Sequence, residues 1–394
     1  MNDVSAEHAR PRVAFLVTSL SGSGHLVRTL ALADAVAETR AETGAENGAR
    51  TLVLSGGRPL GDLAAPAVPL VQLPPLLVAG RDFSRPTDAA GRPADADLMA
   101  ARRAAIQAAL ETFAPDVLVA ETWPLGRRRL TDEFLEAIAT ARAARPSAKV
   151  LTSVRDIPEP PSRPDRITTA ATHLADHVDA VLCHGDQDVL PLHTTWPLPA
   201  DGPPIRYTGY VATKATPAPA AGSRDEVLVA VGGGDIGAAL LDLAARAALL
   251  SARPWRLRVG GPAAAARALA LSAQYPAPNL TIEPAGADYR ARLARAAVSV
   301  SLAGYNTVTD LAPLDTPALL VPDETAGERE QAIRADALAR SPGIVVSRLE
   351  ALTERGLSEL AEAMAKGPRR PPLPLSLDGA ARAAEIILTN AGRS

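Results

Sequence analysis

The chain has 394 residues, more than one hydrophobic core usually organises, so two domains are expected. With 41 Lys and Arg against 44 Asp and Glu, the formal net charge is −3, which excludes a strong electrostatic basis for binding nucleic acid. The single cysteine, Cys183, excludes an internal disulfide and a cysteine-based zinc site, and its apolar neighbours predict a core position.

The N-terminal residues are polar and lack the apolar stretch of a signal peptide. No apolar run in the sequence reaches the length of a membrane span. We therefore expect a cytoplasmic protein, and peripheral contact with the inner membrane face stays open.

Short apolar strands alternate with helical patterns along most of the chain, which is typical of parallel sheets covered by helices. The first strand is expected at 13–18, followed by a glycine loop and a helix from His25 to Glu38 with one apolar face. Further strands are expected at 51–55, 67–72, 116–120, 149–154 and 179–183. Together they predict a Rossmann-like α/β domain over residues 1–212.

The segment 200–224 is rich in Pro, Ala and Gly, has weak periodicity, and is interpreted as an inter-domain linker centred on 213–224. A second alternating array follows within residues 225–376, with strands expected at 226–231, 255–260, 279–283, 298–302 and 317–321. The last helix, about 379–391, comes after a proline-rich stretch, and Asp378 is a plausible N-cap. The two halves share only the order strand, glycine loop, helix.

The first glycine loop runs Gly22-Ser23-Gly24-His25 and leads on to Arg28. Open α/β sheets bind ligands at the edge where such loops leave the strands. An imidazole at a helix start tends to stay neutral and can take a proton at neutral pH, so His25 is the leading candidate for a general base.

Three carboxylates are alternative bases because each lies near a predicted strand end: Asp116, Glu121 and Asp156. Asp156 has a second interpretation, a structural ion pair with Arg155. A helix-start hydrogen-bonding residue is likewise the second interpretation of His25.

The second glycine loop, Gly232–Gly237, formally matches the dinucleotide pattern G-x-G-x-x-G after a strand. That pattern needs an acidic residue some twenty positions on to hold a ribose, and residues 256–262 contain no carboxylate. A nicotinamide cofactor is therefore disfavoured. Asp235 can cap the helix that follows this loop.

A buried strand, a glycine turn, a short helix and a further buried strand follow one another over 298–322, and another helix begins near Glu328. Helix N-termini at strand ends attract anions. Gly304, Thr307 and Asp310 recur at a spacing that puts the last two on one helix face.

This stretch, with the two glycine loops, resembles the family 28 glycosyltransferases of the GT-B fold. The resemblance implies two Rossmann-like domains facing across a cleft, with the helix in 377–394 packing back on the first domain. It implies an enzyme that moves a sugar from a nucleotide-diphosphate sugar, most plausibly a UDP-sugar, to an acceptor hydroxyl, with inversion and without a metal or another cofactor. The acceptor would be a sugar, a lipid-linked molecule or another small molecule.

The same resemblance assigns roles to particular residues. Donor binding falls to Gly233, Gly234, Gly304, Asn306, Thr307, Asp310, Glu330 and Gln331. Asp310 stands where the family has a ribose-binding Glu; its alternative is an acid favoured by the helix dipole, and that of Gln331 is an exposed helix position. Gly22, Ser23, Gly24 and Arg28 form the acceptor-side loop, beside the catalytic candidates His25 and Asp156.

Other interpretations stay open. The opening loop is also similar to UDP-sugar hydrolases of pseudaminic acid synthesis, so a nucleotide-sugar hydrolase or epimerase is an alternative, as is a non-catalytic nucleotide-sugar-binding protein. Asp95-x-Asp97 enters a helix and His173 with His177 lack a third ligand, so neither predicts a metal site. The apolar segment 73–82 could line an acceptor pocket, touch a membrane, or form a buried crossover.

Overall fold

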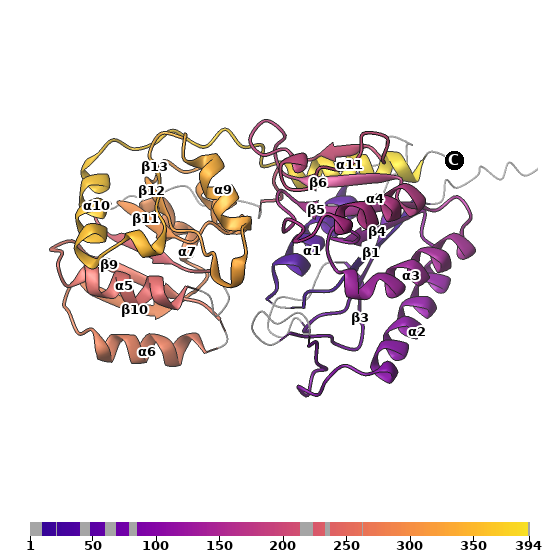
Figure 1. Ribbon diagram of the computed structural model, residues 1–394, viewed down its shortest axis with the longest axis horizontal. Helices are drawn as coiled ribbons and strands as arrows, with labels where there is room; N and C mark the ends of the chain where they lie inside the picture. Colours follow the sequence, from indigo (N-terminus) through magenta and orange to yellow (C-terminus); the bar gives the residue numbers. More distant parts are fainter. Residues whose placement is uncertain are drawn as a thin grey trace, which may run out of the picture. The chain divides into compact units, whose positions relative to one another are not determined.

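The computed structural model describes residues 10–20, 22–39, 48–59, 68–78, 85–212, 224–232, 237–261 and 263–392. The chain forms two compact units (Figure 1): unit 1 contains residues up to 211 and from 376 onward, and unit 2 contains residues 212–375. Each unit is built on a parallel sheet with helices, so the predicted α/β class is confirmed.

Unit 1 has a seven-stranded parallel sheet in the order β3-β2-β1-β4-β5-β6-β7. Its strands are β1 (Arg12–Val17), β2 (Arg50–Ser55), β3 (Leu70–Gln72), β4 (Val117–Glu121), β5 (Lys149–Arg155), β6 (Ala180–His184) and β7 (Ile205–Tyr207). Its helices are α1 (Gly24–Glu38), α2 (Ala96–Phe113), η1 (Arg128–Leu130), α3 (Thr131–Ala144), α4 (Asp165–His177), η2 (Leu192–Thr194) and α11 (Gly379–Ala391).

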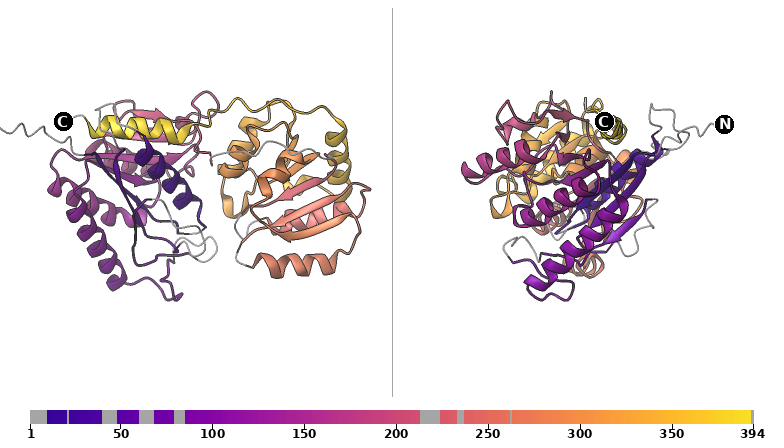
Figure 2. Two further views of the ribbon diagram at one scale, coloured as in Figure 1. Left: turned by 180° about the vertical axis from the view of Figure 1, so that it is seen from behind. Right: turned by 90° about the vertical axis from the view of Figure 1, so that its right-hand side faces the viewer.

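Two hydrophobic layers enclose this sheet because successive strand residues point to opposite faces. Leu16, Leu118 and their neighbours pack under α2, α3 and α4, whereas Phe15 and Val119 pack under α1 and α11. Helix α11 lies along α1 (Figure 2), although it follows unit 2 in the sequence. Cys183 is fully buried in the first layer.

Strand β7 corrects the interpretation of 200–224 as linker throughout. Residues 205–207 form the edge strand of the sheet, paired with β6. Three residues flanked by Pro and Gly carry too little periodicity to reveal a strand, and pairing with β6 decides it. Residues 213–223, most of the expected linker, lie outside the described part of the chain.

The two chain segments that enter unit 1 lie side by side. Val211 pairs antiparallel with Asp378, and the Tyr210 N–H donates to the Ser376 carbonyl at 2.7 Å. Gly209 has a φ of +80°, and a Cβ there would meet the Ser376 side chain, so only glycine fits this crossing. Asp378 precedes α11, but its carboxylate accepts from Ser376 instead of capping the helix.

Unit 2 has a six-stranded parallel sheet in the order β10-β9-β8-β11-β12-β13. Its strands are β8 (Val227–Ala230), β9 (Trp255–Val259), β10 (Leu280–Pro284), β11 (Val298–Ser301), β12 (Ala318–Leu320) and β13 (Ile344–Val346). Its helices are α5 (Ala238–Ala248), α6 (Ala264–Gln274), α7 (Tyr289–Arg295), α8 (Tyr305–Leu311), η3 (Thr325–Gly327), α9 (Glu330–Leu338), η4 (Leu349–Ala351) and α10 (Glu354–Lys366).

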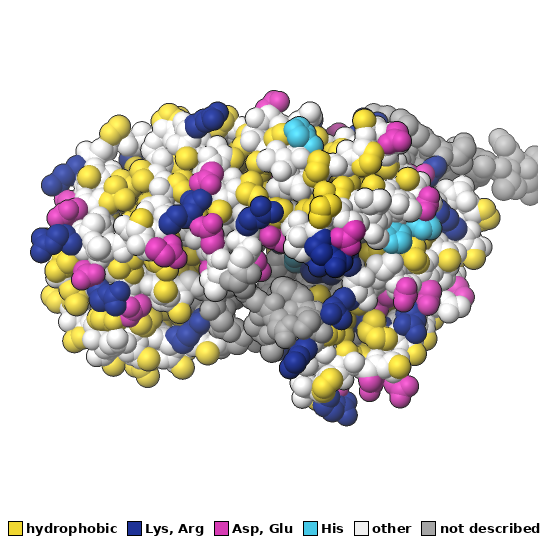
Figure 3. Space-filling view, in the orientation of Figure 1, with side chains coloured by type: hydrophobic (Ala, Val, Ile, Leu, Met, Phe, Trp, Pro, Cys, Tyr) yellow, Lys and Arg dark blue, Asp and Glu magenta, His cyan; other side chains and the backbone are white. Residues whose placement is uncertain are grey.

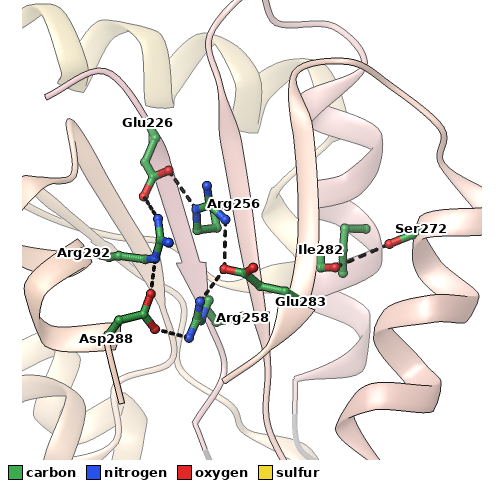
Figure 4. Close-up of polar contacts among 8 residues, drawn as sticks. All are labelled: Glu226, Arg256, Arg258, Ser272, Ile282, Glu283, Asp288 and Arg292. Atoms are coloured by element: carbon green, nitrogen blue, oxygen red, sulfur yellow. Dashed lines mark hydrogen bonds and ion pairs between the residues drawn. The ribbon is translucent and has the colours of Figure 1, made fainter. Parts of the chain in front are cut away.

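A closed ring of ion pairs crosses one face of this sheet (Figure 4). Arg256 and Arg258 on β9 both reach Glu283 on β10. Arg258 also reaches Asp288 at 2.6 Å, and Arg292 on α7 links Asp288 to Glu226. Glu226 pairs with Arg256 at 2.9 Å, which closes the ring. The opposite face of the sheet packs its apolar side chains under α5, α6 and α10.

Candidate functional site

In unit 1 the site forms where β1 and β4 lie next to each other. The helix after β1 covers one face of the sheet and the helix after β4 covers the other. Open α/β sheets bind ligands at such a reversal, beside the carboxyl ends of the strands. The first turn of α1 carries His25 to this edge, and Glu121 ends β4 there.

Three side chains meet at this edge. His25 Nδ1 lies 2.6 Å from Glu121 Oε1, and Arg28 Nη2 lies 2.6 Å from the same oxygen. Glu121 and Arg28 are buried, whereas His25 keeps 17% of its side chain exposed. An imidazole that donates Nδ1–H to a carboxylate leaves the Nε2 lone pair free to take a proton. The arrangement therefore suits a general base.

Electrostatics keep His25 neutral and Glu121 ionised. Burial lowers the pKa of His25 to about 4, although Glu121 opposes this, and the charges of Arg127 and Arg155 lower it further. Burial alone would raise the pKa of Glu121, but His25, Arg28 and Arg127 together hold it well below its usual range. A neutral imidazole beside a carboxylate is thus the state expected at neutral pH.

A second buried imidazole lies close behind this group. His184 is bonded to Ser153 Oγ at 2.8 Å and to Thr208 Oγ1 at 2.9 Å, and burial lowers its pKa to about 3. Thr208 donates to the Gly209 carbonyl, so it accepts from His184 Nδ1. These contacts fix the ends of β5 and β6 beside Glu121.

The other candidate residues of unit 1 lie at different places around the sheet. Gly22, Ser23 and Gly24 are exposed at the start of α1, but Arg28 is buried against Glu121 instead of lining the loop. Asp156 is buried beyond β5, accepts from the Ile157 N–H, and is not a polar partner of the His25 side chain among the described residues. Asp116 lies at the amino edge of the sheet, paired with Arg145, so it is wrong as a candidate base.

In unit 2 the predicted donor residues gather at the corresponding edge, beside the carboxyl ends of β11 and β12. Gly304 begins α8, with Asn306 exposed and Thr307 partly exposed on that helix. Gln331 Oε1 accepts from the backbone N–H groups of Ala303 and Asp323, both at 3.1 Å. Gln331 therefore links the turns that follow β11 and β12. This contradicts the alternative in which Gln331 is only an exposed helix residue. Gly233 and Gly234 lie outside the described residues.

Two arginines that the sequence did not single out support these residues. Arg334 is buried, donates to the Ala303 carbonyl at 2.8 Å, and pairs with Glu330 at 2.7 Å. Arg290 on α7 pairs with Asp310 at 2.8 Å. Burial raises the pKa of Asp310, and Arg290 opposes that rise. The Glu330–Arg334 spacing of four residues on α9 is a local pattern that could have marked Arg334, whereas Arg290 pairs with Asp310 on another helix and has no such signal.

The discounted patterns have structural explanations. Asp95 caps α2 by accepting from the Leu98 N–H at 2.8 Å, and His173 and His177 pack beside Trp123. No group of three or more metal-ligating side chains occurs in the described segments. Of the apolar segment 73–82, Leu73, Leu76 and Val78 are buried, and residues 79–82 are not described. None of the described helices is long and apolar enough to span a membrane.

Comparison with known proteins shows which protein family part of this chain resembles. Residues 271–387 match the glycosyltransferase family 28 C-terminal domain. A UDP-N-acetylglucosamine--N-acetylmuramyl-(pentapeptide) pyrophosphoryl-undecaprenol N-acetylglucosamine transferase of Mesorhizobium japonicum is 32% identical over 174 residues, which is 43% of this chain and 46% of that protein. The chain thus spans about half the length of this curated relative.

Solved structures share the fold over nearly the whole chain. Acinetobacter baumannii MurG superposes with a TM-score of 0.54 and 18% identity over 98% of this chain and 96% of that one. The calicheamicin glycosyltransferase CalG4 gives a TM-score of 0.56 and 15% identity over the same shares of the two chains. The chain thus has the GT-B fold and resembles the family 28 glycosyltransferases, whose C-terminal domain residues 271–387 match.

Proposed function

We propose that the chain is a glycosyltransferase that moves a sugar from a nucleotide-diphosphate sugar to an acceptor hydroxyl, with inversion and without a metal. The observation that carries the proposal is the pairing of His25 Nδ1 with Glu121 at the β1–β4 edge. His25 Nε2 takes the proton of the acceptor hydroxyl while its oxygen bonds to the anomeric carbon. The bond to the diphosphate breaks on the opposite side, and the leaving group keeps the electron pair.

Glu121 holds the imidazole in the tautomer that this step needs and stabilises the imidazolium that forms. The second oxygen of Glu121, Oε2, is buried and forms no hydrogen bond with the described residues, so that oxygen does not hold another part of the fold in place. Asp156 is kept as a second carboxylate at the same edge. We assign it no proton transfer, because it does not bond the His25 side chain.

The donor is proposed to bind unit 2. Gly304, Asn306 and Thr307 offer backbone N–H groups and a hydroxyl to the diphosphate, supported by Gln331 and Arg334 from α9. Asp310 is proposed for the ribose and Glu330 for the sugar, and Gly233 and Gly234 are proposed as further phosphate neighbours. A UDP-sugar is favoured because the relative from Mesorhizobium japonicum is named for a UDP-sugar donor.

That relative is also named for a pyrophosphoryl-undecaprenol acceptor, which supports a sugar-containing, lipid-linked or other small acceptor here. A cytoplasmic enzyme with peripheral contact at the inner membrane face fits such an acceptor. Both statements belong to the proposal.

Thermal melting with UDP, GDP, dTDP, ADP and their sugar conjugates tests the donor site. A ligand at about a hundred times its Kd adds roughly 2.7 kcal/mol of stability. We expect stabilisation by one nucleotide that Thr307→Ala removes and Thr389→Ala, an exposed hydroxyl on α11, leaves intact. No stabilisation by any nucleotide diphosphate would overturn the proposal. Sugar release without acceptor at the full turnover rate would favour a hydrolase instead.

A further inference from the structure

Arg127 places a guanidinium without a partner next to the candidate base. It lies six residues after Glu121, in the loop that joins β4 to η1. Its Nε is buried, and within the part of the chain that the structure describes its side chain makes no hydrogen bond or ion pair. Glu121 is the opposite charge near it, but the bonded oxygen of Glu121 is taken by His25 and Arg28, so the partly buried guanidinium gains no hydrogen bond from it.

The backbone at this position is strained as well. Arg127 has a φ of 55° and Thr122, at the other end of the loop, a φ of 68°. Side chains other than glycine rarely adopt this left-handed conformation, and such strain clusters at ligand sites. The residue directly before Arg127 is Gly126. The left-handed conformation is therefore adopted by the arginine and not by the neighbouring glycine, which would adopt it with less strain.

Arg127 belongs to a cluster with an excess of positive charge. Arg28 pairs with Glu121, and Arg155 ends the neighbouring strand β5, next to the buried Asp156. Among the described residues no carboxylate forms a hydrogen bond or ion pair with Arg127. Burial lowers the pKa of Arg127, the charge of Glu121 opposes this, and the charges of Arg155 and Arg28 lower it further.

The positive charge extends along the loop. Arg128 and Arg129 follow directly and are exposed, and burial together with the charges of Arg166 and Arg163 lowers the pKa of Arg128. Figure 3 shows Lys and Arg side chains on this face of unit 1 among Asp and Glu side chains. A chain with a net charge of −3 therefore concentrates cations beside His25.

We infer that Arg127 is a specificity-determining residue that binds an anionic group of the acceptor, such as a phosphate or a carboxylate. This anion supplies the hydrogen-bond acceptors that the described residues do not offer to Arg127, and it places the acceptor hydroxyl near His25. The identification of the bound molecule as an acceptor rests on the proposed function. The anion site itself rests on the unpaired guanidinium and its neighbours.

Calorimetric titration of the full chain with inorganic pyrophosphate tests the site. We compare the wild type with Arg127→Gly and Arg127→Lys, and with Arg103→Gln as a control, since Arg103 pairs with Glu136 on another surface of unit 1. Charge-assisted hydrogen bonds predict pyrophosphate affinity about 10- to 100-fold weaker in Arg127→Gly, partly retained in Arg127→Lys, and unchanged in the control.

Folding cannot explain such a loss, because glycine suits a φ of 55° and should keep or raise the melting temperature of Arg127→Gly. UDP affinity should be unchanged in Arg127→Gly, while Thr307→Ala should lose UDP affinity and, with UDP in excess to fill any remaining donor site, keep the pyrophosphate affinity that depends on Arg127. Equal pyrophosphate affinity in Arg127→Gly and wild type would overturn the inference. A parallel loss of UDP affinity would overturn it too, by assigning Arg127 to the donor. Pyrophosphate binding through Arg127 in a chain that binds no nucleotide would support the anion site and reject the proposed function.

Discussion

Nδ1 of His25 lies 2.6 Å from Oε1 of Glu121, so the first turn of α1 and the last residue of β4, 96 positions apart, share one hydrogen bond. Because this bond selects the tautomer with a free Nε2, its loss should slow the chemical step more than it weakens donor binding.

We expect Glu121→Gln to reduce kcat by about 10²- to 10⁴-fold, the range typical of general base catalysis, because the amide group can present its NH₂ to Nδ1 and favour the wrong tautomer. Steady-state kinetics with the preferred donor and UDP titration would measure the two effects separately. Asp156→Asn is the comparison, since Asp156 does not bond the His25 side chain. An equal loss in both variants would contradict the role given to Glu121.

Acid should destabilise the fold through His25 and His184, whose pKa values burial lowers from 6.5 to about 4 and about 3. Between pH 6.5 and 5 these histidines bind protons in the unfolded chain and not in the native one. The free energy of unfolding therefore falls as pH falls, by up to about 1.4 kcal/mol per pH unit for each histidine.

Urea denaturation at pH 6.5, 6 and 5 would measure this slope. His184→Gln should remove the share of His184, whereas His193→Gln, an exposed histidine, should leave the slope unchanged. Identical slopes in the wild type and His184→Gln would show that His184 is not held neutral.

Arg102 holds three turns at the carboxyl edge of unit 1. Both it and Glu133 are fully buried, and all five N–H groups of its guanidinium have acceptors. The partners besides Glu133 are the carbonyls of Gly56 and Pro74 and the hydroxyl of Thr18.

Arg102→Met leaves a buried carboxylate unpaired and should cost about 3–5 kcal/mol of unfolding free energy, measured with urea. Adding Glu133→Leu should recover part of that loss, but the Pro74 carbonyl still lacks the donor that Arg102 supplied, whereas the Gly56 carbonyl keeps the Leu76 N–H. Arg103→Met, at a partly exposed pair with Glu136, should change stability by about 0.5 kcal/mol or less. Matching losses in the two single variants would mean that burial of the pair does not matter.

Two variants of Gln331 distinguish its contribution to stability from a direct contact with the donor. Its Oε1 accepts from the N–H groups of Ala303 and Asp323, so Gln331→Ala leaves both donors unbonded and should cost about 1–3 kcal/mol. Gln331→Glu keeps an acceptor oxygen and should stay close to wild-type stability. If Gln331→Glu nevertheless loses donor affinity in a UDP-sugar titration, the amide contacts the donor directly. Unchanged stability of Gln331→Ala would contradict the bracing role.

The ion-pair ring of unit 2 should respond unequally to loss of its members. Arg258 is 4% exposed and Arg292 28%, so Arg258→Met removes the more buried guanidinium and its bonds to Glu283 and Asp288, although these carboxylates keep Arg256 and Arg292 as partners. We expect a loss of roughly 1–3 kcal/mol for Arg258→Met and less than about 1 kcal/mol for Arg292→Met by urea denaturation. Higher salt should widen the difference between the two losses because it screens the more exposed pairs of Arg292 first.

Much of the fold could be predicted from local pattern. Apolar runs bounded by Gly or Pro marked β1, β4 and β11 to within a residue or two, because a strand buried on both faces needs a continuous apolar sequence. The edge strands β7 and β13 were not predicted. Each has three residues, and only pairing with a neighbouring strand makes them strands.

The candidate site was predictable in part. The glycine loop and helix start pointed to His25, and the α8 spacing pointed to Thr307, because turn chemistry and helix periodicity are local properties. Glu121 could be named only as an alternative base. Its pairing with His25 depends on β1 lying beside β4, which no local pattern states.

The sequence by itself determined the alternation of strands and helices, the glycine turns and the residues that start helices at the sheet edges, since these follow from backbone preference and apolar spacing. Which charges are buried together, such as Arg102 with Glu133, follows from the packing of distant segments, as does the lack of a bonded carboxylate for Arg127 among the described residues. The physical reason is that the cost of a charge depends on the solvent and partners that remain after distant segments pack around it.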